Sequence, residues 1–206
     1  MQDSKLDQFA RLISEWPGLM AGPDRALIDD SLVLVDHLGA ALDLVDVGSG
    51  AGLPGIVLKI ARPELQVTLI EADQAKAAFL VHACAMLRLE NVEVVARRAE
   101  EAGHDPALRE KFDVAVARAL APLPVLVELC LPLVRVGGRL LAQKTKDEDP
   151  ATAAGAITLL GGKLSEVLAA PSEARATGTV VVIDKVRPGP AQYPRRPGVP
   201  ARKPLS

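Results

Sequence analysis

A glycine-rich loop that directly follows a short apolar run is the feature that most constrains the fold of this chain. The run Leu42–Val45 has the character of a buried strand, and the loop Asp46–Gly55 contains four glycines. Glycine reaches positive φ and lets backbone N–H groups approach a ligand closely. Glu71 ends the next apolar run, where an acidic side chain can bind ribose hydroxyls. The pattern predicts a site for a nucleoside-containing cofactor at the carboxyl ends of parallel strands.

The same loop matches two cofactor motifs. Gly50–Gly55 matches the G-x-G-x-x-G pattern of dinucleotide sites, and Asp46–Gly52 matches the acidic-x-G-x-G-x-G loop of S-adenosylmethionine-dependent methyltransferases. Pro54 removes an N–H that a pyrophosphate would use, and the Asp46 carboxylate favours a sulfonium or ammonium group over a pyrophosphate. The loop therefore favours S-adenosylmethionine, with a nicotinamide-dependent oxidoreductase as the alternative.

The composition indicates one domain with short extensions. The 206 residues are 49% hydrophobic but only 2% aromatic, so Leu, Val, Ile and Ala should form the core. A net charge of −2 excludes a uniformly basic nucleic-acid-binding protein but not a local basic patch. Cys84 and Cys130 lie in apolar segments, Met1–Ala10 does not resemble a signal peptide, and no apolar run reaches membrane-spanning length. We therefore expect a cytoplasmic protein with free thiols, and the three scattered histidines predict no metal site.

Strands and helices alternate along most of the chain. This order predicts an α/β fold, a doubly wound, Rossmann-like sheet of the class I methyltransferase type with helices on both faces. Apolar residues at helical spacing predict an N-terminal helix that ends at Pro17-Gly18, and two late β-rich runs predict an antiparallel hairpin at one sheet edge. The predicted strands are 42–47, 66–71, 92–95, 113–118, 138–144, 164–169 and 179–186, and the helices after the first are 24–38, 54–61, 73–88, 122–135 and 151–160.

The last part of the chain has a different composition. Lys185–Ser206 contains six prolines and six Lys or Arg residues but no acidic residue. Because proline does not sustain a helix or a sheet ladder, we expect this segment to form no secondary structure by itself. Because all the charges of this segment are positive, we favour a basic arm that contacts phosphates. The alternative is a terminus that is only solvated. We divide the chain into a helical extension (1–40), a cofactor-binding methyltransferase domain (41–186) and a Pro/Arg-rich tail (187–206).

Several short motifs occur along the chain: Asp30–Leu32, Asp46–Gly55, Ala61–Glu64, Arg98–Glu101, Ala117–Leu123, Leu131–Leu133, Gly137-Gly138, Lys144, Tyr193–Pro200 and Lys203–Leu205. Taken together, these motifs resemble those of the bacterial 16S ribosomal RNA guanine-N7 methyltransferases, also called the glucose-inhibited division protein B family. The resemblance covers roughly residues 25–204. The chain departs from the family at Ala26 and Leu27, where a basic residue and a histidine are usual, and at Thr145, where glycine is usual.

The resemblance implies methyl transfer from S-adenosylmethionine to N7 of a guanine in 16S ribosomal RNA. We expect the substrate to be this RNA or the small ribosomal subunit, and the protein to be a monomer. Guanine N7 attacks through a lone pair without first losing a proton, so no general base is needed and positioning should supply most of the catalysis. A small-molecule methyltransferase is the alternative, and a non-catalytic scaffold is a weaker one.

The predicted site residues form three groups. Arg118, which ends the strand 113–118, and Lys144 are the predicted catalytic residues. We expect Arg118 to contact RNA or the methionine carboxylate of the cofactor, with a structural ion pair to a loop acid as the alternative. Asp46 should hold either the amino-acid end of the cofactor or a loop N–H, and the resemblance implies that the Ala99 backbone contacts the adenine. The predicted cofactor-binding residues are Asp46, Gly48, Ser49, Gly50, Gly52, Leu53, Glu71, Arg98, Ala99, Glu100 and Arg118, and the predicted RNA-binding residues are Arg195, Arg196, Arg202 and Lys203.

Overall fold

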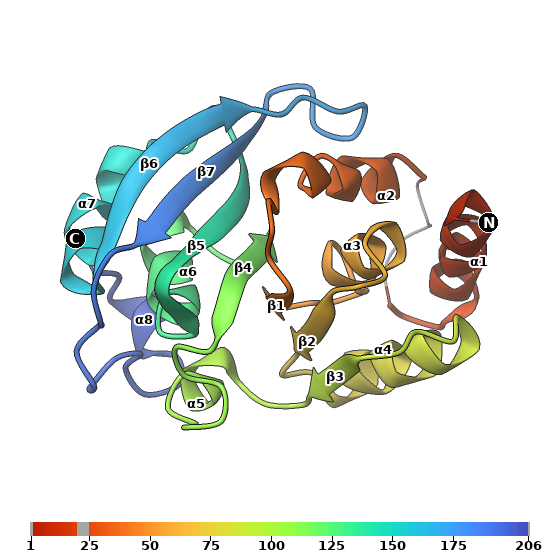
Figure 1. Ribbon diagram of the computed structural model, residues 1–206, viewed down its shortest axis with the longest axis horizontal. Coiled ribbons are helices and arrows are strands. Elements are labelled where there is room, and N and C mark those ends of the chain that lie inside the picture. Colours follow the sequence, from red (N-terminus) through yellow and green to blue (C-terminus); the bar gives the residue numbers. More distant parts are fainter. Residues whose placement is uncertain (1, 20–24, 206) are drawn as a thin grey trace.

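One seven-stranded sheet runs through the computed structural model, which describes residues 2–19 and 25–205 (Figure 1). The strand order is β3-β2-β1-β4-β5-β7-β6; β1 to β5 pair in parallel, and β7 is antiparallel to both β5 and β6. The predicted sheet, with its antiparallel edge, is confirmed. The strands are β1 (Asp43–Val47), β2 (Gln66–Ile70), β3 (Val92–Val95), β4 (Phe112–Arg118), β5 (Val134–Thr145), β6 (Gly162–Ala169) and β7 (Gly178–Lys185).

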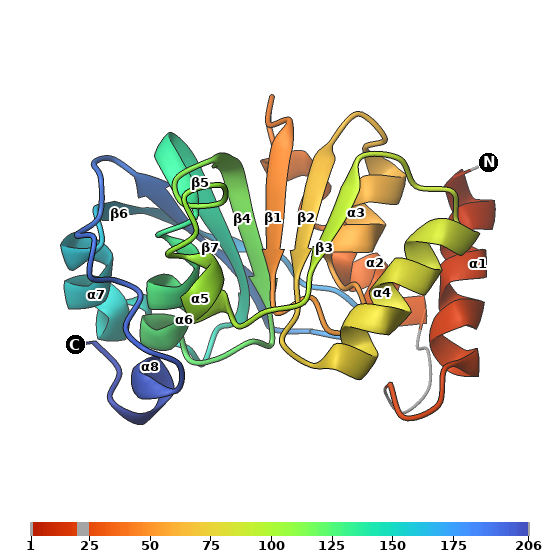
Figure 2. The ribbon, with the colours of Figure 1, turned by 90° about the horizontal axis from the view of Figure 1, so that it is seen from below.

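Alternating side chains along the central strands build two hydrophobic cores, one on each face of the sheet. Leu44 and Val114 belong to the first core, and their neighbours Val45 and Ala115 belong to the second. Successive strand residues point to opposite faces, so a sheet covered on both faces needs strands that are apolar throughout. The first core lies under α1 (Gln2–Glu15), α2 (Arg25–Leu32), α3 (Gly55–Ala61) and α4 (Gln74–Met86), and the second under α5 (Ala99–Ala102), α6 (Leu123–Cys130) and α7 (Ala154–Leu159) (Figure 2).

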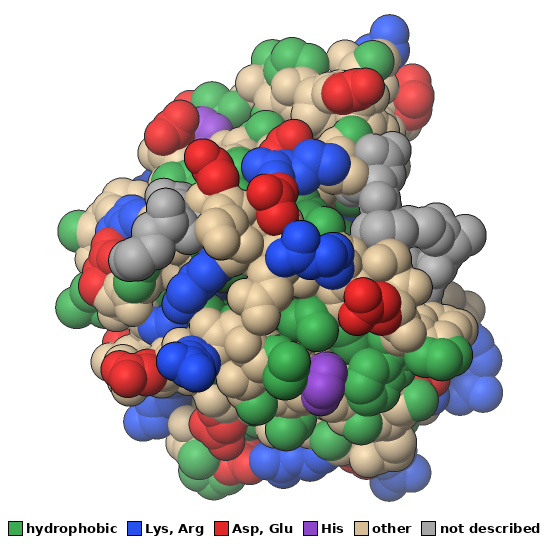
Figure 3. All heavy atoms as spheres, turned by 90° about the vertical axis from the view of Figure 1, so that its right-hand side faces the viewer, with side chains coloured by type: hydrophobic (Ala, Val, Ile, Leu, Met, Phe, Trp, Pro, Cys, Tyr) green, Lys and Arg blue, Asp and Glu red, His purple; other side chains and the backbone are tan. Residues whose placement is uncertain are grey.

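The predicted N-terminal helix is confirmed as α1, which buries Phe9 in the first core. The second predicted helix is shorter than expected: α2 ends at Leu32, a 3₁₀ turn follows at Val35–His37, and the predicted start at Asp24 lies outside the described residues. Figure 3 views the side of the molecule that α1 and α4 form: charged side chains cover its centre, and apolar side chains gather below them. None of the described helices is both long and apolar enough to cross a membrane.

Two other predicted helices also differ from the structure. The helix predicted over 122–135 is α6, which ends at Cys130, because Pro132 lacks the N–H that a continuing helix requires. The helix predicted over 151–160 consists of a 3₁₀ turn at Pro150–Ala153 and the short α7. The four-residue α5 escaped prediction because it is too short to show a helical period.

The C-terminal segment, residues 187–205, packs against the body of the protein. Arg109 donates hydrogen bonds to the carbonyl oxygens of Tyr193 (2.7 Å) and Pro190 (3.2 Å), and Nε2 of His104 lies 2.6 Å from the carbonyl oxygen of Pro194. One helical turn, α8 (Val199–Arg202), forms within it. We expected no secondary structure in this segment by itself, and the single turn of α8 forms where side chains of the body bind the carbonyl oxygens of the segment.

Candidate active site

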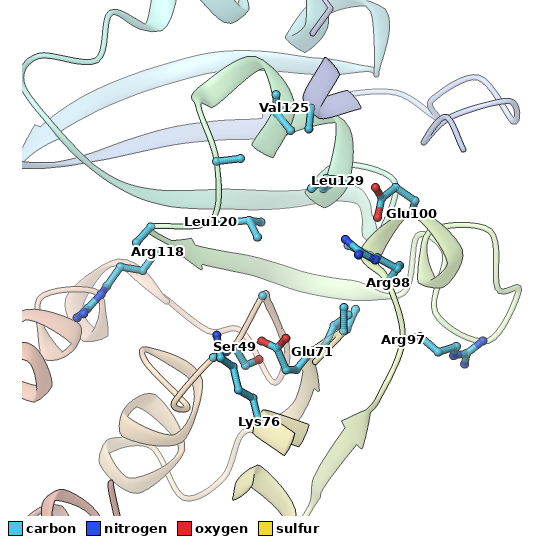
Figure 4. A pocket seen from close by; sticks show the side chains of 18 of the residues that line it. Ser49, Glu71, Lys76, Arg97, Arg98, Glu100, Arg118, Leu120, Val125 and Leu129 are labelled. Carbon is cyan, nitrogen blue, oxygen red and sulfur yellow. Dashed lines mark hydrogen bonds between the residues drawn. The ribbon is translucent and has the colours of Figure 1, made fainter. Parts of the chain in front are cut away.

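A cavity of about 530 Å³ opens at the carboxyl ends of β1, β2 and β4 (Figure 4). The strand order reverses between β1 and β4, which is where doubly wound sheets bind ligands. The volume lies in the range of small-molecule sites. Of the predicted cofactor-binding residues, those that line the cavity are Gly48, Ser49, Gly50, Leu53, Glu71, Arg98, Ala99, Glu100 and Arg118, whereas Asp46 and Gly52 lie behind the wall.

The glycine loop follows β1 and forms one wall of the cavity. The backbone φ angles of Gly48, Gly50 and Gly52 are +74°, +53° and +84°. Residues that have a Cβ rarely adopt such positive values. A Cβ on Gly48 would lie 2.5 Å from Cδ1 of Leu120. The absence of that Cβ therefore lets the loop after β1 meet the loop after β4 at the cavity.

Glu71 joins this loop to the end of β2. Its Oε2 accepts a hydrogen bond from the N–H of Gly50, and its Oε1 accepts one from the N–H of Asp73, both at 2.8 Å. A carboxylate oxygen has two lone pairs, so Glu71 can accept further hydrogen bonds from a ligand. Binding of ribose hydroxyls by Glu71 stays a prediction that this geometry permits.

Asp46 lies wholly buried beneath the loop. Its Oδ2 accepts a hydrogen bond from the N–H of Gly55 at 2.9 Å, while its Oδ1 has no partner among the described residues. Burial raises the pKa of Asp46 to about 7, and the hydrogen bond from Gly55 opposes part of that rise. Of the two roles expected for Asp46, the structure shows the one that holds a loop N–H.

The side chain of Arg118 points away from Glu71 toward α2 (Figure 4). It donates a hydrogen bond to the carbonyl oxygen of Leu27 (2.9 Å) and lies 3.5 Å from Oδ2 of Asp30. Burial lowers the pKa of Arg118, and the charge of Asp30 opposes this effect. The sequence left open an ion pair between Arg118 and a loop acid. The structure shows such an ion pair, but its acid, Asp30, lies on the helix α2. A direct catalytic contact by Arg118 stays a prediction.

Lys144, the second predicted catalytic residue, is not part of the cavity wall. Its Nζ donates a hydrogen bond to the carbonyl oxygen of Ala121 and lies 2.9 Å from Oε2 of Glu148. Glu148 also accepts a hydrogen bond from the N–H of Leu123. This geometry makes Lys144 a support for the loop between β4 and α6, one layer behind the cavity.

Two cations face the cavity without an acidic partner among the described residues. Figure 4 shows the side chains of Lys76 and Arg98 pointing into the cavity from α4 and from the turn before α5. The sequence analysis predicted Arg98 as a site residue but missed Lys76. The only sequence feature that could have indicated Lys76 is its position in the first turn of the helix after Glu71. The apolar wall formed by Leu120, Val125 and Leu129 also gave no local signal.

The C-terminal segment supplies the remaining wall of the cavity, through Gly198, Pro200 and Ala201. Arg195, predicted to contact RNA, instead places its guanidinium 2.6 Å from the carboxylate of Glu128, which is wholly buried. The other predicted RNA-binding residues, Arg196, Arg202 and Lys203, are exposed and lie within two positions of residues that line the cavity. None of their three charged groups has a partner among the described residues.

Neither metal ligands nor disulfides mark this site. In residues 2–19 and 25–205, no three His, Cys, Asp or Glu side chains are grouped to hold a metal ion. Cys84 and Cys130 are free thiols, and burial raises the pKa of both.

Sequence comparison relates the chain to ribosomal RNA methyltransferases. The family model described as rRNA small subunit methyltransferase G matches residues 24–176. The ribosomal RNA small subunit methyltransferase G of Roseiflexus sp. (strain RS-1) is 43% identical over 219 residues, which cover 100% of this chain and 94% of that protein. The Acetivibrio thermocellus protein of the same name is 37% identical, with 100% and 91% covered.

Solved structures at low sequence identity share the fold. M. jannaschii TYW2, solved in complex with AdoMet, has a TM-score of 0.61 at 16% identity and covers 79% of this chain and 78% of its own. The mitomycin 7-O-methyltransferase MmcR has a TM-score of 0.64 at 15% identity, with 79% and 55% covered. These two similarities support the class I methyltransferase fold alone.

Proposed function

Because this chain belongs to the rRNA small subunit methyltransferase G family, we propose that it transfers the methyl group of S-adenosylmethionine to N7 of a guanine in 16S ribosomal RNA. The observation that supports the reaction most directly is the hydrogen bond between Glu71 and Gly50 at the edge of the cavity. It brings together the carboxylate and the glycine loop that a nucleoside cofactor requires.

The residues of the cavity suit S-adenosylmethionine. Gly48 and Gly50 expose backbone without a Cβ, Glu71 retains acceptor capacity for ribose hydroxyls, and the free cations of Lys76 and Arg98 suit a carboxylate of the cofactor. When bound, the cofactor supplies a methyl group already activated by its sulfonium charge.

The protein's part in the reaction is to position the two reactants. Both carboxylates of the cavity wall already accept backbone hydrogen bonds, Glu71 from Gly50 and Glu100 from Gly198. Neither is needed as a base, because guanine N7 has no proton to lose. The apolar side chain of Leu120 offers a surface on which a purine can stack and from which water is excluded, so orientation contributes most of the rate.

The RNA strand can reach this cavity beside the C-terminal segment. Arg196, Arg202 and Lys203 flank the part of the segment that lines the cavity, and phosphates next to the target guanine would meet their charges. A base that must leave its stack is more accessible in a single-stranded loop than in a duplex. We place this reaction in the cytoplasm, with a monomeric enzyme and either 16S RNA or the small subunit as its substrate.

Mass mapping of 16S RNA from cells with and without the gene tests this function. We expect one guanine to lose an N7 methyl group in the deletion strain and to regain it with the wild-type gene. A gene with Gly50→Asp should fail to restore it, because a side chain there would occupy the ligand side of the loop. Identical RNA from both strains would contradict the proposal and favour a small-molecule substrate.

A further inference from the structure

Glu128 is a buried acid that serves the C-terminal segment. It lies on α6 with no exposed surface, and Arg195 supplies its three hydrogen bonds: two to Oε1 from the backbone N–H and Nε (2.8 Å each) and one to Oε2 from Nη2 (2.6 Å). Nη2 also donates to the carbonyl oxygen of Lys203 at 2.7 Å. A carboxylate is costly to bury unless it is paired, so this pair depends on the segment being in place.

A second carboxylate holds the segment where it reaches the cavity. Oε1 of Glu100 accepts a hydrogen bond from the N–H of Gly198 at 2.9 Å, and Glu100 itself belongs to the cavity wall (Figure 4). Residues 195 and 198 are therefore fixed to α6 and α5. Pro200 and Ala201, two and three residues after Gly198, line the cavity.

We propose that Glu128 is a positioning residue for RNA. By binding Arg195 it fixes the stretch from Arg196 to Lys203 as a wall of the cavity and holds the three free cations of that stretch at its rim. Cations fixed in this way meet phosphates without the entropy loss of ordering a flexible arm. This inference rests on the proposed function, and it gives Arg195 a structural role instead of a contact with phosphate.

The two roles for Arg195 predict opposite effects of the substitution Glu128→Gln. The substitution removes one negative charge and weakens the hold on Arg195. If Arg195 bound phosphate, the added positive charge and the freed guanidinium would strengthen RNA binding. If Glu128 positions the segment, the same substitution weakens RNA binding although the protein becomes more positive.

The experiment measures binding of a 16S RNA fragment by fluorescence anisotropy at several salt concentrations. We expect Glu128→Gln and Arg195→Gln each to weaken binding about tenfold, and the double variant to be no weaker than Arg195→Gln alone, because each change breaks the same contact. The salt dependence should stay that of the wild type, since Arg196, Arg202 and Lys203 remain. Glu166→Gln, which removes an exposed acid on β6 with no ion-pair partner in the described chain, is the matched control.

Arg195→Lys and limited trypsin digestion give independent results. Lysine keeps the charge but cannot form the bidentate contact with Glu128, so RNA binding should still weaken. Trypsin should then cleave the C-terminal segment of this variant before it cleaves the body of the protein. Equal or tighter RNA binding by Glu128→Gln, or a shallower salt dependence for Arg195→Gln, would overturn the proposal. Failure of the wild type to bind S-adenosylmethionine in calorimetry would contradict the proposed function instead.

Discussion

The carboxylate of Glu71 accepts a hydrogen bond from the backbone N–H of Gly50 at 2.8 Å, which joins the end of β2 to the loop after β1. The same carboxylate accepts the N–H of Asp73, whose side chain caps α4. One side chain thus fixes the positions of two loops that form the cavity. The site is organised by the protein alone, which reduces the cost of ordering it when a ligand binds.

Glu71→Gln should weaken binding of S-adenosylmethionine by roughly 10- to 100-fold, as expected for the loss of charge-assisted hydrogen bonds. The amide has a single acceptor oxygen, and its NH₂ group would face an N–H donor of the loop. Isothermal titration calorimetry measures the change. Glu93→Gln, on the exposed surface of the neighbouring strand β3, is the control and should bind like the wild type. Unchanged affinity of Glu71→Gln would place the cofactor elsewhere.

Gly48→Ala should weaken cofactor binding, whereas Gly39→Ala should not. Both glycines have positive φ (+74° and +58°), so both substitutions should destabilise the protein by about 1 kcal/mol through backbone strain. Only the Cβ at position 48 meets a side chain, at 2.5 Å from Leu120, while nothing lies within 4 Å of the one at Gly39. Thermal unfolding combined with calorimetry separates the two effects. Equal cofactor affinity in the two variants would show that the contact with Leu120 is irrelevant.

Asp30→Asn should destabilise the protein by about 3 kcal/mol, because it leaves two partly buried guanidinium groups without their shared, buried acid. Asp30 is 1% exposed and lies within 3.5 Å of both Arg118 and Arg175. Asp29→Asn removes the next acid on the same helix, whose partner Arg25 is exposed, and should change stability by less than about 0.5 kcal/mol. Urea unfolding at pH 7 compares them. Similar losses in both variants would contradict a buried charge cluster.

Asp46 should make the protein less stable as the pH rises from about 4 to about 7. Its pKa is raised to about 7 in the folded protein, against about 3.9 for an unperturbed aspartate, so in this range the unfolded chain has lost the proton that the folded protein still binds. Below this range both states are protonated and the penalty vanishes. Asp46→Asn keeps an acceptor for Gly55 but cannot ionise, so its stability relative to the wild type should increase by about 4 kcal/mol from pH 4 to pH 8. Parallel stability curves for the two proteins would exclude the raised pKa.

The sequence predicted those parts of the molecule that depend on local pattern. Apolar runs separated by helical segments predicted every strand of the sheet to within a few residues, and the glycine loop with Glu71 predicted the position of the cavity. Proline at position 132 could have limited α6, but an apolar run on both sides concealed the boundary.

The partners of the predicted arginines escaped prediction because they lie in distant parts of the chain. Arg118 binds Leu27, 91 positions away, and Arg195 binds Glu128, 67 positions away. No sequence periodicity links residues so far apart. The charge of the C-terminal segment therefore indicated a free arm, although the acids that bind the segment, Glu100 and Glu128, lie on α5 and α6. Composition gives the charge of a segment but not the acids that neutralise it.

Methyl transfer to unmethylated small-subunit RNA tests the central claim most directly. The purified protein is incubated with S-adenosylmethionine labelled in its methyl group and with small subunits from a strain that lacks the gene, and the digested RNA is mapped by mass spectrometry. We predict one labelled methyl group on N7 of a single guanine of 16S RNA, with the label much reduced for Glu71→Gln. Label on another atom, on other RNA or only on small molecules, from protein that binds the cofactor, would contradict it.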